Sequence, residues 1–217
     1  MQLPFSQACV NNKDPILGVL QRHLLAGEHR QPLRVLEIAG GTGQHAVHLI
    51  THMPWLHWQS SDIPEHVDSL NLRITAASNA NLPPALPLDV TQEDWDVGQF
   101  DAVFTANSLH IMPASAVEEF FRHLDKVIVP GGFLCVYGPF KYGGEFTTPS
   151  NAQFDLWLKS RNPLSGVRDF EWVSELAIKA GLTLLEDNAM PANNQLLVWQ
   201  SYPCFKRRQP HVDSHLN

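Results

Sequence analysis

Residues 35–46 read Val35-Leu36-Glu37-Ile38-Ala39-Gly40-Gly41-Thr42-Gly43-Gln44-His45-Ala46, and this stretch decides the fold. An apolar run that contains an acidic residue near its end is followed by a glycine-rich turn and then by a predicted helix. A helix N-terminus carries unpaired N–H groups and partial positive charge. Glycine allows both positive φ angles and the close approach of a ligand to the backbone. The stretch therefore predicts a nucleotide-cofactor site between a strand and a helix of an α/β protein.

The bulk composition limits the kinds of partner. The chain has 217 residues, of which 44% are hydrophobic, and a formal net charge of −7. That length suits one sizeable α/β domain, and the negative charge argues against nucleic acid as the main partner. Three scattered cysteines (Cys9, Cys135 and Cys204) lack disulfide or metal spacing, which is typical of a cytoplasmic protein. Neither a signal peptide nor an apolar run of the roughly 18 residues of a membrane span is expected.

Strand and helix patterns alternate along the chain, which favours a mostly parallel sheet with helices on both faces. We expect a Rossmann-like sheet of seven strands that ends in an antiparallel hairpin, within a single domain over 1–202. A disordered tail is expected over 203–217. The expected strands are 33–39, 55–61, 86–88, 101–106, 133–138, 182–187 and 195–200. The expected helices after the first are 43–51, 65–78, 114–127, 152–160 and 169–180, and 139–151 is expected to be a long active-site loop.

The first helix is expected to begin at Asp14-Pro15, which resembles an N-cap followed by the first helical position, and to end at Gly27. Residues 1–12 are then expected to be irregular. This leader, with Ser6, Asn11, Asn12 and Lys13, has two alternatives: it folds back over the cofactor site as a lid, or it is a loose tail before a packing helix.

Two cofactors compete for the glycine-rich stretch. Gly41-x-Gly43-x-x-Ala46 satisfies the dinucleotide fingerprint, and Asp62 lies near the distance expected for a ribose-binding acid. These two features alone would support NAD. The fingerprint is short, so the rest of the chain has to choose between NAD and S-adenosylmethionine.

Four features favour S-adenosylmethionine. Glu37 can receive a cationic amino group, directly or through water, and NAD has no such group near this turn. Asp62, after the second strand, can accept both ribose hydroxyls. Asp89 and Val90, after the third strand, suit an adenine amino group and an adenine face. Finally, Pro130-Gly131-Gly132 before the fifth strand, together with a terminal hairpin, gives seven strands rather than six.

These residues resemble the class I methyltransferase superfamily, over 33–138 by motif and to about 201 by strand order. Ala39 departs from the usual pattern, which has glycine there. The variant Glu37-Ile38-Ala39-Gly40-Gly41-Thr42-Gly43-Gln44-His45 occurs with Asn12-Lys13-Asp14-Pro15-Ile16-Leu17 and Met190-Pro191-Ala192-Asn193-Asn194. Together they are similar to the methyltransferase-like domain-of-unknown-function family 938, over nearly the whole chain except the tail.

The resemblance implies S-adenosylmethionine as cofactor and S-adenosylhomocysteine as product, but it brings no substrate. The expected cofactor-binding residues are Glu37, Ala39, Gly41, Gly43, His45, Asp62, Asp89, Val90 and Asn107. His45, His48 and His52 recur at helical spacing without carboxylate or cysteine partners, so no metal is expected.

Candidate catalytic residues follow the fourth and fifth strands, where open α/β sheets bind ligands. Asn107 can contact the amino-acid portion of the cofactor. His110 is a candidate general base or, alternatively, a turn cap. Tyr142 can line the substrate pocket, and Arg161 and Arg168 are candidates for holding a substrate anion.

The expected function is therefore cytoplasmic methyl transfer from S-adenosylmethionine to a small-molecule acceptor. The alternatives are a cofactor-binding protein without turnover and an NAD-dependent oxidoreductase. The sequence leaves the acceptor and the oligomeric state open.

Overall fold

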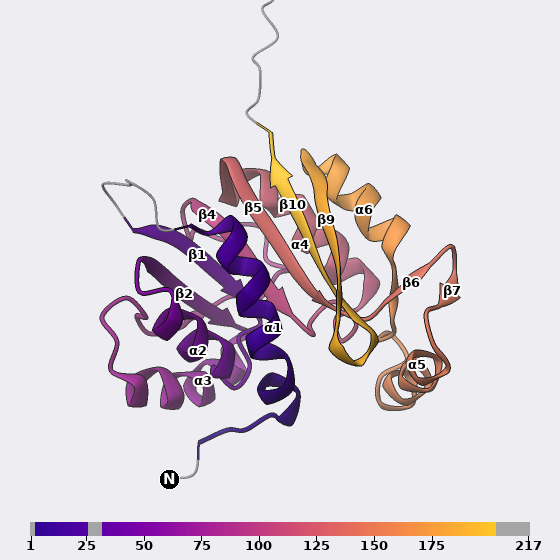
Figure 1. Ribbon diagram of the computed structural model, residues 1–217, viewed down its shortest axis with the longest axis horizontal. Coiled ribbons are helices and arrows are strands. Elements are labelled where there is room, and N and C mark those ends of the chain that lie inside the picture. Colours follow the sequence, from indigo (N-terminus) through magenta and orange to yellow (C-terminus); the bar gives the residue numbers. More distant parts are fainter. Residues whose placement is uncertain (1–2, 26–31, 203–217) are drawn as a thin grey trace, which may run out of the picture.

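The computed structural model describes residues 3–25 and 32–202, and its framework is a seven-stranded sheet (Figure 1). The strand order is β3-β2-β1-β4-β5-β10-β9. The strands are β1 (Leu33–Ile38), β2 (Leu56–Asp62), β3 (Leu86–Pro87), β4 (Phe100–Ala106), β5 (Ile128–Gly138), β9 (Leu182–Met190) and β10 (Asn194–Ser201). The expected seven-stranded α/β architecture is confirmed.

The strand directions bring several carboxyl ends to one edge of the sheet. β1 pairs in parallel with β2 and β4, and β4 pairs in parallel with β5. β10 runs antiparallel to both β5 and β9, which confirms the expected terminal hairpin. β4 is buried on both faces, as its continuous apolar sequence predicts. The residues that follow β1, β2, β4 and β5 therefore share one edge.

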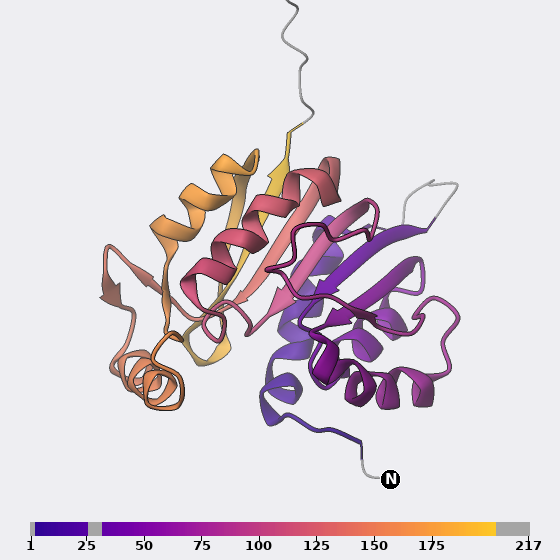
Figure 2. The same ribbon diagram turned by 180° about the vertical axis from the view of Figure 1, so that it is seen from behind.

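Helices cover both faces of the sheet, as Figures 1 and 2 show from opposite sides. One apolar core joins the sheet to α1 (Gln7–His23), α2 (Gln44–His52) and α3 (Pro64–Ala77). The other core joins it to α4 (Ala114–Val127) and α6 (Phe170–Lys179). The buried stripe of α4 includes Val117, Phe120, Phe121, Leu124 and Val127, at the spacing that the sequence predicts.

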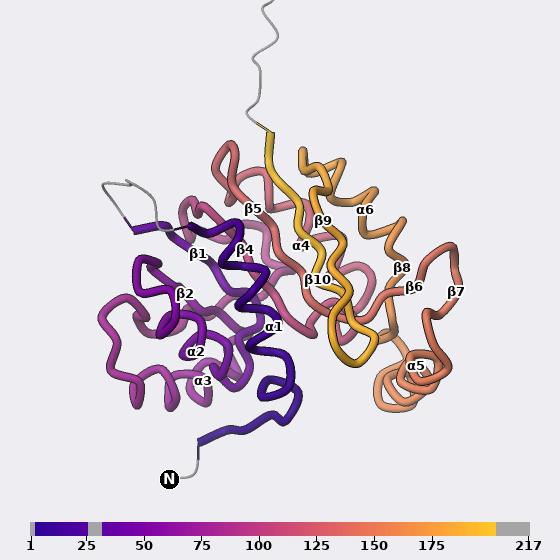
Figure 3. The backbone as a smooth tube through the Cα atoms, in the orientation of Figure 1, coloured from indigo at the N-terminus to yellow at the C-terminus, as the bar shows by residue number. Residues whose placement is uncertain are grey.

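The segment after β5 forms a small accessory unit beside the hairpin, in the orange part of the tube in Figure 3. Its strands β6 (Phe140–Tyr142), β7 (Glu145–Phe146) and β8 (Arg168–Asp169) make a sheet of order β7-β6-β8. The expectation of one long loop over 139–151 is wrong, because short strands interrupt it. Helix α5 (Pro149–Arg161) follows, and the Thr148 side chain accepts the Asn151 N–H at its N-terminus.

The expected start of the first helix is also wrong. α1 begins at Gln7, so Asp14 and Pro15 lie inside it and residues 7–12 are helical. Proline has no N–H to donate to the carbonyl of Asn11. The helix continues because Asn12, Ile16, Val19 and Leu20 are buried, so tertiary packing outweighs the local start signal. Gly27 and the tail from 203 lie outside the described residues. No helix in the described part of the chain is long and apolar enough to cross a membrane.

Pro130-Gly131-Gly132 forms an irregularity within β5 rather than the turn expected before it. The pairing register with β4 shifts between Phe100 and Ala102. Gly131 has φ +85°, which favours glycine. A Cβ on Gly132 would lie 2.7 Å from the carbonyl oxygen of Asp101, so the two backbones approach too closely for a side chain.

We predict that Gly132→Ala destabilises the protein by about 1–3 kcal/mol, because the added methyl group forces two strands apart. Gly18→Ala is the matched control, since nothing lies within 4 Å of its added Cβ. Alanine in this helix interior should stabilise by about 0.5–1 kcal/mol. Urea denaturation measures both changes, and equal unfolding midpoints for the two variants would contradict the assigned close approach.

Candidate glycine-rich cofactor site

The loop between β1 and α2 is held by three residues in the left-handed backbone region. Ala39 has φ +58°, Gly41 has φ +57°, and Gly43, at the N-cap of α2, has φ +71°. Glycine adopts this region freely, whereas a residue with a Cβ is strained there by about 1–2 kcal/mol. Ala39 therefore keeps the turn that glycine usually makes in the class I pattern, at a cost in backbone strain.

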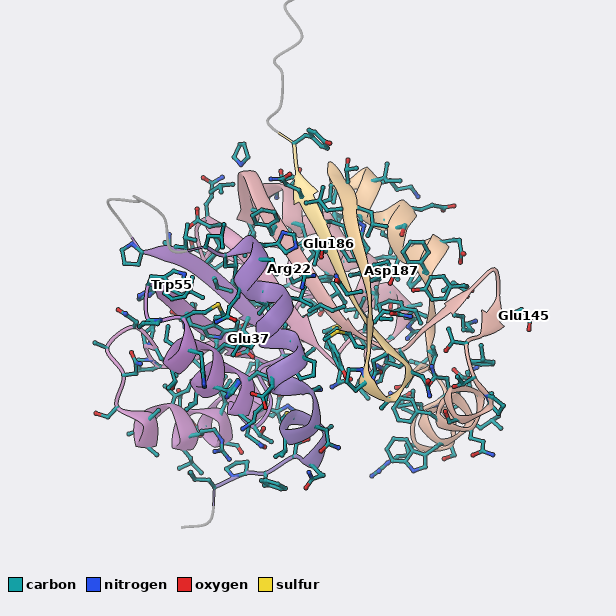
Figure 4. The ribbon with its side chains drawn as sticks, viewed as in Figure 1. Arg22, Glu37, Trp55, Glu145, Glu186 and Asp187 are labelled. Atoms are coloured by element: carbon teal, nitrogen blue, oxygen red, sulfur yellow. The ribbon has the colours of Figure 1, made fainter. Side chains whose placement is uncertain are left out.

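Glu37 lies beneath this loop and is 2% exposed. Its Oε2 atom accepts hydrogen bonds from Ser60 Oγ (2.6 Å) and Trp58 Nε1 (3.1 Å) on neighbouring β2. Burial raises the pKa of the Glu37 carboxyl, and these two hydrogen bonds partly oppose the rise. A Cβ on Gly40 would lie 3.1 Å from the same oxygen, so a side chain there would press on the carboxylate. Figure 4 shows Glu37 in the interior, behind α1 in this view.

Asp62 connects the end of β2 to the loop. Its side chain is nearly buried, and Oδ2 accepts the Gly41 N–H at 2.8 Å. The other oxygen, Oδ1, accepts the Ile63 N–H at 2.8 Å and lies 3.2 Å from His66 Nδ1. The carboxylates of Glu37 and Asp62 therefore flank the glycine-rich loop, one beneath it and one at its side.

Asp89 and Val90 follow β3 at the same edge of the sheet. Asp89 is partly exposed, and its Oδ1 atom accepts from the Thr91 N–H (2.9 Å) and hydroxyl (2.8 Å). Val90 is 6% exposed, and its carbonyl accepts from Trp95 Nε1 at 3.4 Å. The structure thus fixes an acid and an apolar side chain next to each other, as the adenine prediction requires.

The leader before the long helix lies against the glycine-rich loop and is not a loose tail. Ser6 donates its N–H to Gln44 Oε1 (2.6 Å), and Gln44 Nε2 donates to the Ser6 carbonyl (3.3 Å). Arg73 of α3 donates to the Thr42 carbonyl at 2.7 Å and also to the carbonyl of Pro4. The loop, α2, α3 and the leader are therefore joined by hydrogen bonds.

His45 sits in a buried polar cluster under this leader. Its Nε2 atom lies 2.7 Å from Asn12 Oδ1, and its Nδ1 atom lies 3.8 Å from Cys9 Sγ. Burial, assisted by the charge of His48, lowers the pKa of His45 to about 4. The imidazole is therefore neutral at neutral pH and contributes hydrogen bonds rather than charge.

Asn107 and His110 follow β4. Asn107 adopts φ +57°, which asparagine tolerates, and donates its N–H to the Tyr137 carbonyl at 2.8 Å. His110 is 5% exposed, and a Cβ on Gly138 would lie 3.6 Å from its Nδ1 atom. Burial and the charge of Arg168 lower the pKa of His110 to about 4. His110 is neutral at neutral pH, the form that accepts a proton, but its basicity is weak.

Tyr142 lies in the accessory unit, apart from the loop cluster. Its ring stacks on Phe170 at 5.0 Å, and its hydroxyl donates to Asp187 Oδ2 at 2.7 Å. Burial and this contact with Asp187, which Figure 4 labels, raise the pKa of Tyr142 well above its ordinary value. No hydrogen bond among the described residues joins Tyr142 to the glycine-rich loop, so its catalytic role stays a prediction.

The two arginines proposed for substrate binding are engaged elsewhere. Arg168 donates to the carbonyls of Leu109 (3.1 Å) and Leu164 (3.0 Å), and also to that of Met112. It therefore supports the turn that carries His110. Arg161 lies over the ring of Trp157, with its Cζ atom 4.8 Å from the ring centroid.

Sequence reasoning missed Trp58, Ser60 and Arg73. Trp58 and Ser60 could have been found from strand pairing, because Glu37 is in register with Ser60 across β1 and β2. No local sequence pattern identifies Arg73 as a site residue. It lies in α3 and reaches the glycine-rich loop only because of how α3 packs. Across the described ranges 3–25 and 32–202, no group of three or more His, Cys, Asp or Glu side chains is placed to hold a metal ion.

Comparison with known families adds to this geometry. A family model described as "Protein of unknown function (DUF938)" matches residues 3–201. The chain belongs to the DUF938 family. The resemblance inferred from its motifs is therefore confirmed over nearly its whole length.

Solved structures show which fold the DUF938 chain has. An O-methyltransferase family protein from Burkholderia thailandensis superposes with a TM-score of 0.75 at 20% identity, over 88% of this chain and 57% of that one. Human N-acetylserotonin methyltransferase in complex with SAM superposes with a TM-score of 0.75 at 14% identity, over 91% and 53%. The DUF938 chain therefore has the class I methyltransferase fold, and it spans little more than half the length of these neighbours.

A curated relative matches over a shorter stretch. It is the non-reducing polyketide synthase Preu3 of Preussia isomera, which is 25% identical over 114 residues. That match covers 49% of this chain and 4% of the synthase. It adds no substrate or reaction for the DUF938 chain.

The buried histidine His110 predicts a pH dependence of stability. Its pKa is near the usual 6.5 in the unfolded chain and about 4 in the folded protein. Between these values the unfolded state binds more protons, so stability falls as the pH drops, by about 1.4 kcal/mol per pH unit. His45 contributes a similar slope, because its pKa is also lowered to about 4. His110→Gln should therefore reduce the slope by the His110 contribution relative to wild type in urea denaturation at pH 4.5–7.5.

Phe154→Leu is the matched control, because Phe154 contacts the His110 ring edge-on at 5.3 Å and does not titrate. This variant should lower stability equally at every pH. An unchanged slope in His110→Gln would show that His110 is not held neutral.

Proposed function

We propose that this DUF938 protein is an S-adenosylmethionine-dependent methyltransferase that acts on a small-molecule acceptor. One observation carries the proposal: the buried Glu37 carboxylate lies directly beneath Gly40, while Asp62 is bonded to the N–H of Gly41. The two acids flank the loop that would cradle the cofactor. Their positions fit a ligand that offers a cation to one acid and hydroxyl groups to the other.

The charge at this loop supports S-adenosylmethionine over a dinucleotide. A pyrophosphate at the loop would bring negative charge toward the buried Glu37 carboxylate, which is unfavourable where water is excluded. The ammonium group of an amino-acid-bearing cofactor would instead compensate that carboxylate. Ser60 and Trp58 occupy only Oε2 in the hydrogen bonds described above, so the carboxylate keeps acceptor capacity for such a cation.

The remaining residues at this edge suit the nucleoside end of the same cofactor. Asp62 would accept from ribose hydroxyls, Asp89 would accept from an adenine amino group, and Val90 would pack on the adenine face. A sulfonium cofactor supplies an already activated methyl group, so the protein has to align the acceptor and exclude water. Asn107 and His110, at the end of β4, are the proposed residues next to the transfer.

The acceptor is proposed to be a small molecule on the basis of charge and fold. The chain carries a net charge of −7, which opposes binding to nucleic acid. The fold neighbours include an O-methyltransferase family 2 protein from Planctomyces limnophilus in complex with apigenin, at 16% identity and a TM-score of 0.74 over 89% of this chain and 58% of that one. We place the protein in the cytoplasm, as its cysteine usage indicates.

Calorimetric titration with S-adenosylhomocysteine tests the cofactor directly. We expect the wild-type protein to bind it and Asp62→Ala to bind it about 10- to 100-fold more weakly, since two ribose hydroxyls lose a charged acceptor. Asp68→Ala, on the exposed face of α3, is the matched control and should bind like wild type. Binding of NADH in place of S-adenosylhomocysteine would favour an oxidoreductase and overturn the proposal.

Glu37→Gln should separate binding from stability. The amide still accepts from Ser60 and Trp58 but carries no charge, so S-adenosylhomocysteine should bind about 10- to 100-fold more weakly. A buried acid with a raised pKa destabilises the folded state increasingly as the pH rises. The variant should therefore be more stable than wild type in urea at pH 8, with the difference vanishing near pH 4. A variant that is less stable at pH 8 and binds normally would contradict this assignment.

A further inference from the structure

A buried chain of polar side chains connects four elements beside the loop. Cys9 and Asn12 come from α1, His45 from α2, and Tyr137 from β5, where the Tyr137 hydroxyl faces the side chains of Asn12 and of Asn194 in β10. Asn12, His45 and Tyr137 are each no more than 5% exposed. Buried polar groups weaken a core unless they are bonded, and apolar side chains would pack here at lower cost.

This network joins two stretches that the proposed cofactor contacts leave unused. Asn12 belongs to the stretch 12–17, and Asn194 belongs to the stretch 190–194. Both converge on the side chain of Tyr137 at the carboxyl end of β5. The backbone carbonyl of Tyr137 also accepts the N–H of Asn107, so the network borders the end of β4 as well.

The hydrogen bonds fix the orientation of the Asn12 amide. Its Oδ1 atom faces His45 Nε2 at 2.7 Å, and because a carbonyl oxygen only accepts, Nε2 carries the proton. The Nδ1 atom of His45 is then an acceptor, and it faces the thiol of Cys9. With Oδ1 held by His45 of α2, the amide nitrogen of Asn12 lies on the side of the Tyr137 hydroxyl. One of its two N–H groups faces that hydroxyl, and the other is left for a ligand.

The surroundings favour a negatively charged ligand group. Lys13 and Arg73 line one hollow with His48 and His52, on the outer side of the same helices. Within residues 3–25 and 32–202, neither Lys13 nor Arg73 forms an ion pair with a carboxylate. The Asp14 carboxylate contacts His48 at 2.9 Å beside this hollow, so two cations face one carboxylate there. This positive excess, together with the partial positive charge of the α2 N-terminus, raises the potential near Asn12.

We propose that Asn12 binds the carboxylate of the cofactor's amino-acid end, with His45 and Tyr137 as positioning residues. This inference rests on the proposed function, in which Glu37 takes the ammonium group of the same amino-acid end. The leader and the first turns of α1 then act as a cover that completes the cofactor site. The hydrogen bonds from Ser6 to Gln44, and from Arg73 to Pro4 and Thr42, hold this cover closed.

Two ligands test the assignment in the full chain by calorimetry. S-Adenosylhomocysteine carries the amino-acid end, whereas 5′-methylthioadenosine has the same nucleoside and thioether but lacks it. Asn12→Ala should weaken S-adenosylhomocysteine binding about 10-fold and Asn12→Asp about 100-fold, because the aspartate repels the ligand carboxylate. Both variants should bind 5′-methylthioadenosine within about 2-fold of wild type, since that ligand has no group for residue 12.

Asn11→Ala and Asn11→Asp are the matched controls, because Asn11 is the exposed neighbour on the same helix. They should leave both affinities unchanged. Tyr137→Phe, which removes only the hydroxyl, provides a second variant if the Asn12 changes impair folding, and it should selectively weaken S-adenosylhomocysteine about 3- to 10-fold.

The outcomes separate this inference from the proposed function. Equal losses for both ligands would show that Asn12 and Tyr137 only support the fold, and no loss for either would also overturn the inference while leaving the methyltransferase proposal intact. Failure of the wild-type protein to bind either ligand would overturn the proposed function itself.

Discussion

The burial of the Glu37 carboxylate is the constraint on which the site depends. A charged group removed from water destabilises a fold unless it is bonded, and a partner of opposite charge is the strongest compensation. Here β2 supplies Ser60 and Trp58 to one oxygen, and the loop passes so closely above that a Cβ at position 40 would lie 3.1 Å from that oxygen. None of these contacts supplies a positive charge, so the arrangement fits the cationic ligand group of the proposed function.

The same constraint explains how distant segments come together. β1 ends one residue after the acid, at Ile38, so the loop has to turn at once. Ala39, Gly41 and Gly43 take left-handed conformations to make that turn. Asp62 then fixes the loop from the neighbouring strand through the N–H of Gly41. The leader closes over the exit of the loop through polar contacts, while three of its large apolar side chains, Leu3, Phe5 and Val10, remain exposed. Specific hydrogen bonds therefore contribute strongly to the placement of this cover.

Most of the fold could be predicted from the sequence because local patterns agree with the tertiary structure there. The buried stripe of α4 and the apolar run of β4 each indicate their element without outside information. The prediction for the start of α1 was wrong. Asp14-Pro15 is a strong local start signal, but packing against α2 outweighs it. The short strands β6 and β7 were not predicted, because strands of two or three residues depend on their pairing partners and show no periodicity in the sequence.

The site residues also fall into those that the sequence predicts and those that it does not. Glu37, Asp62 and Asp89 follow predictable strands, so their common edge follows from strand order alone. Arg73 and the contacts of Asn12 depend on how α1 and α3 pack, which no spacing in the sequence encodes. Tyr142 follows a predicted strand, which suggests the substrate pocket, and its contact with Asp187 depends on how the accessory unit packs on β9, which the sequence does not encode. Its role at the substrate stays a prediction.

The most direct test of the central claim is the number of protons released when S-adenosylhomocysteine binds, measured by calorimetry at several pH values from about 5 to 8 in buffers of different ionisation enthalpy. Burial raises the pKa of the Glu37 carboxyl, and an ammonium partner lowers it again, so binding should release protons from this group. The account predicts release by the wild-type protein and its loss in Glu37→Gln. Equal proton release by the two proteins would contradict the claim that Glu37 receives the cationic end of the cofactor.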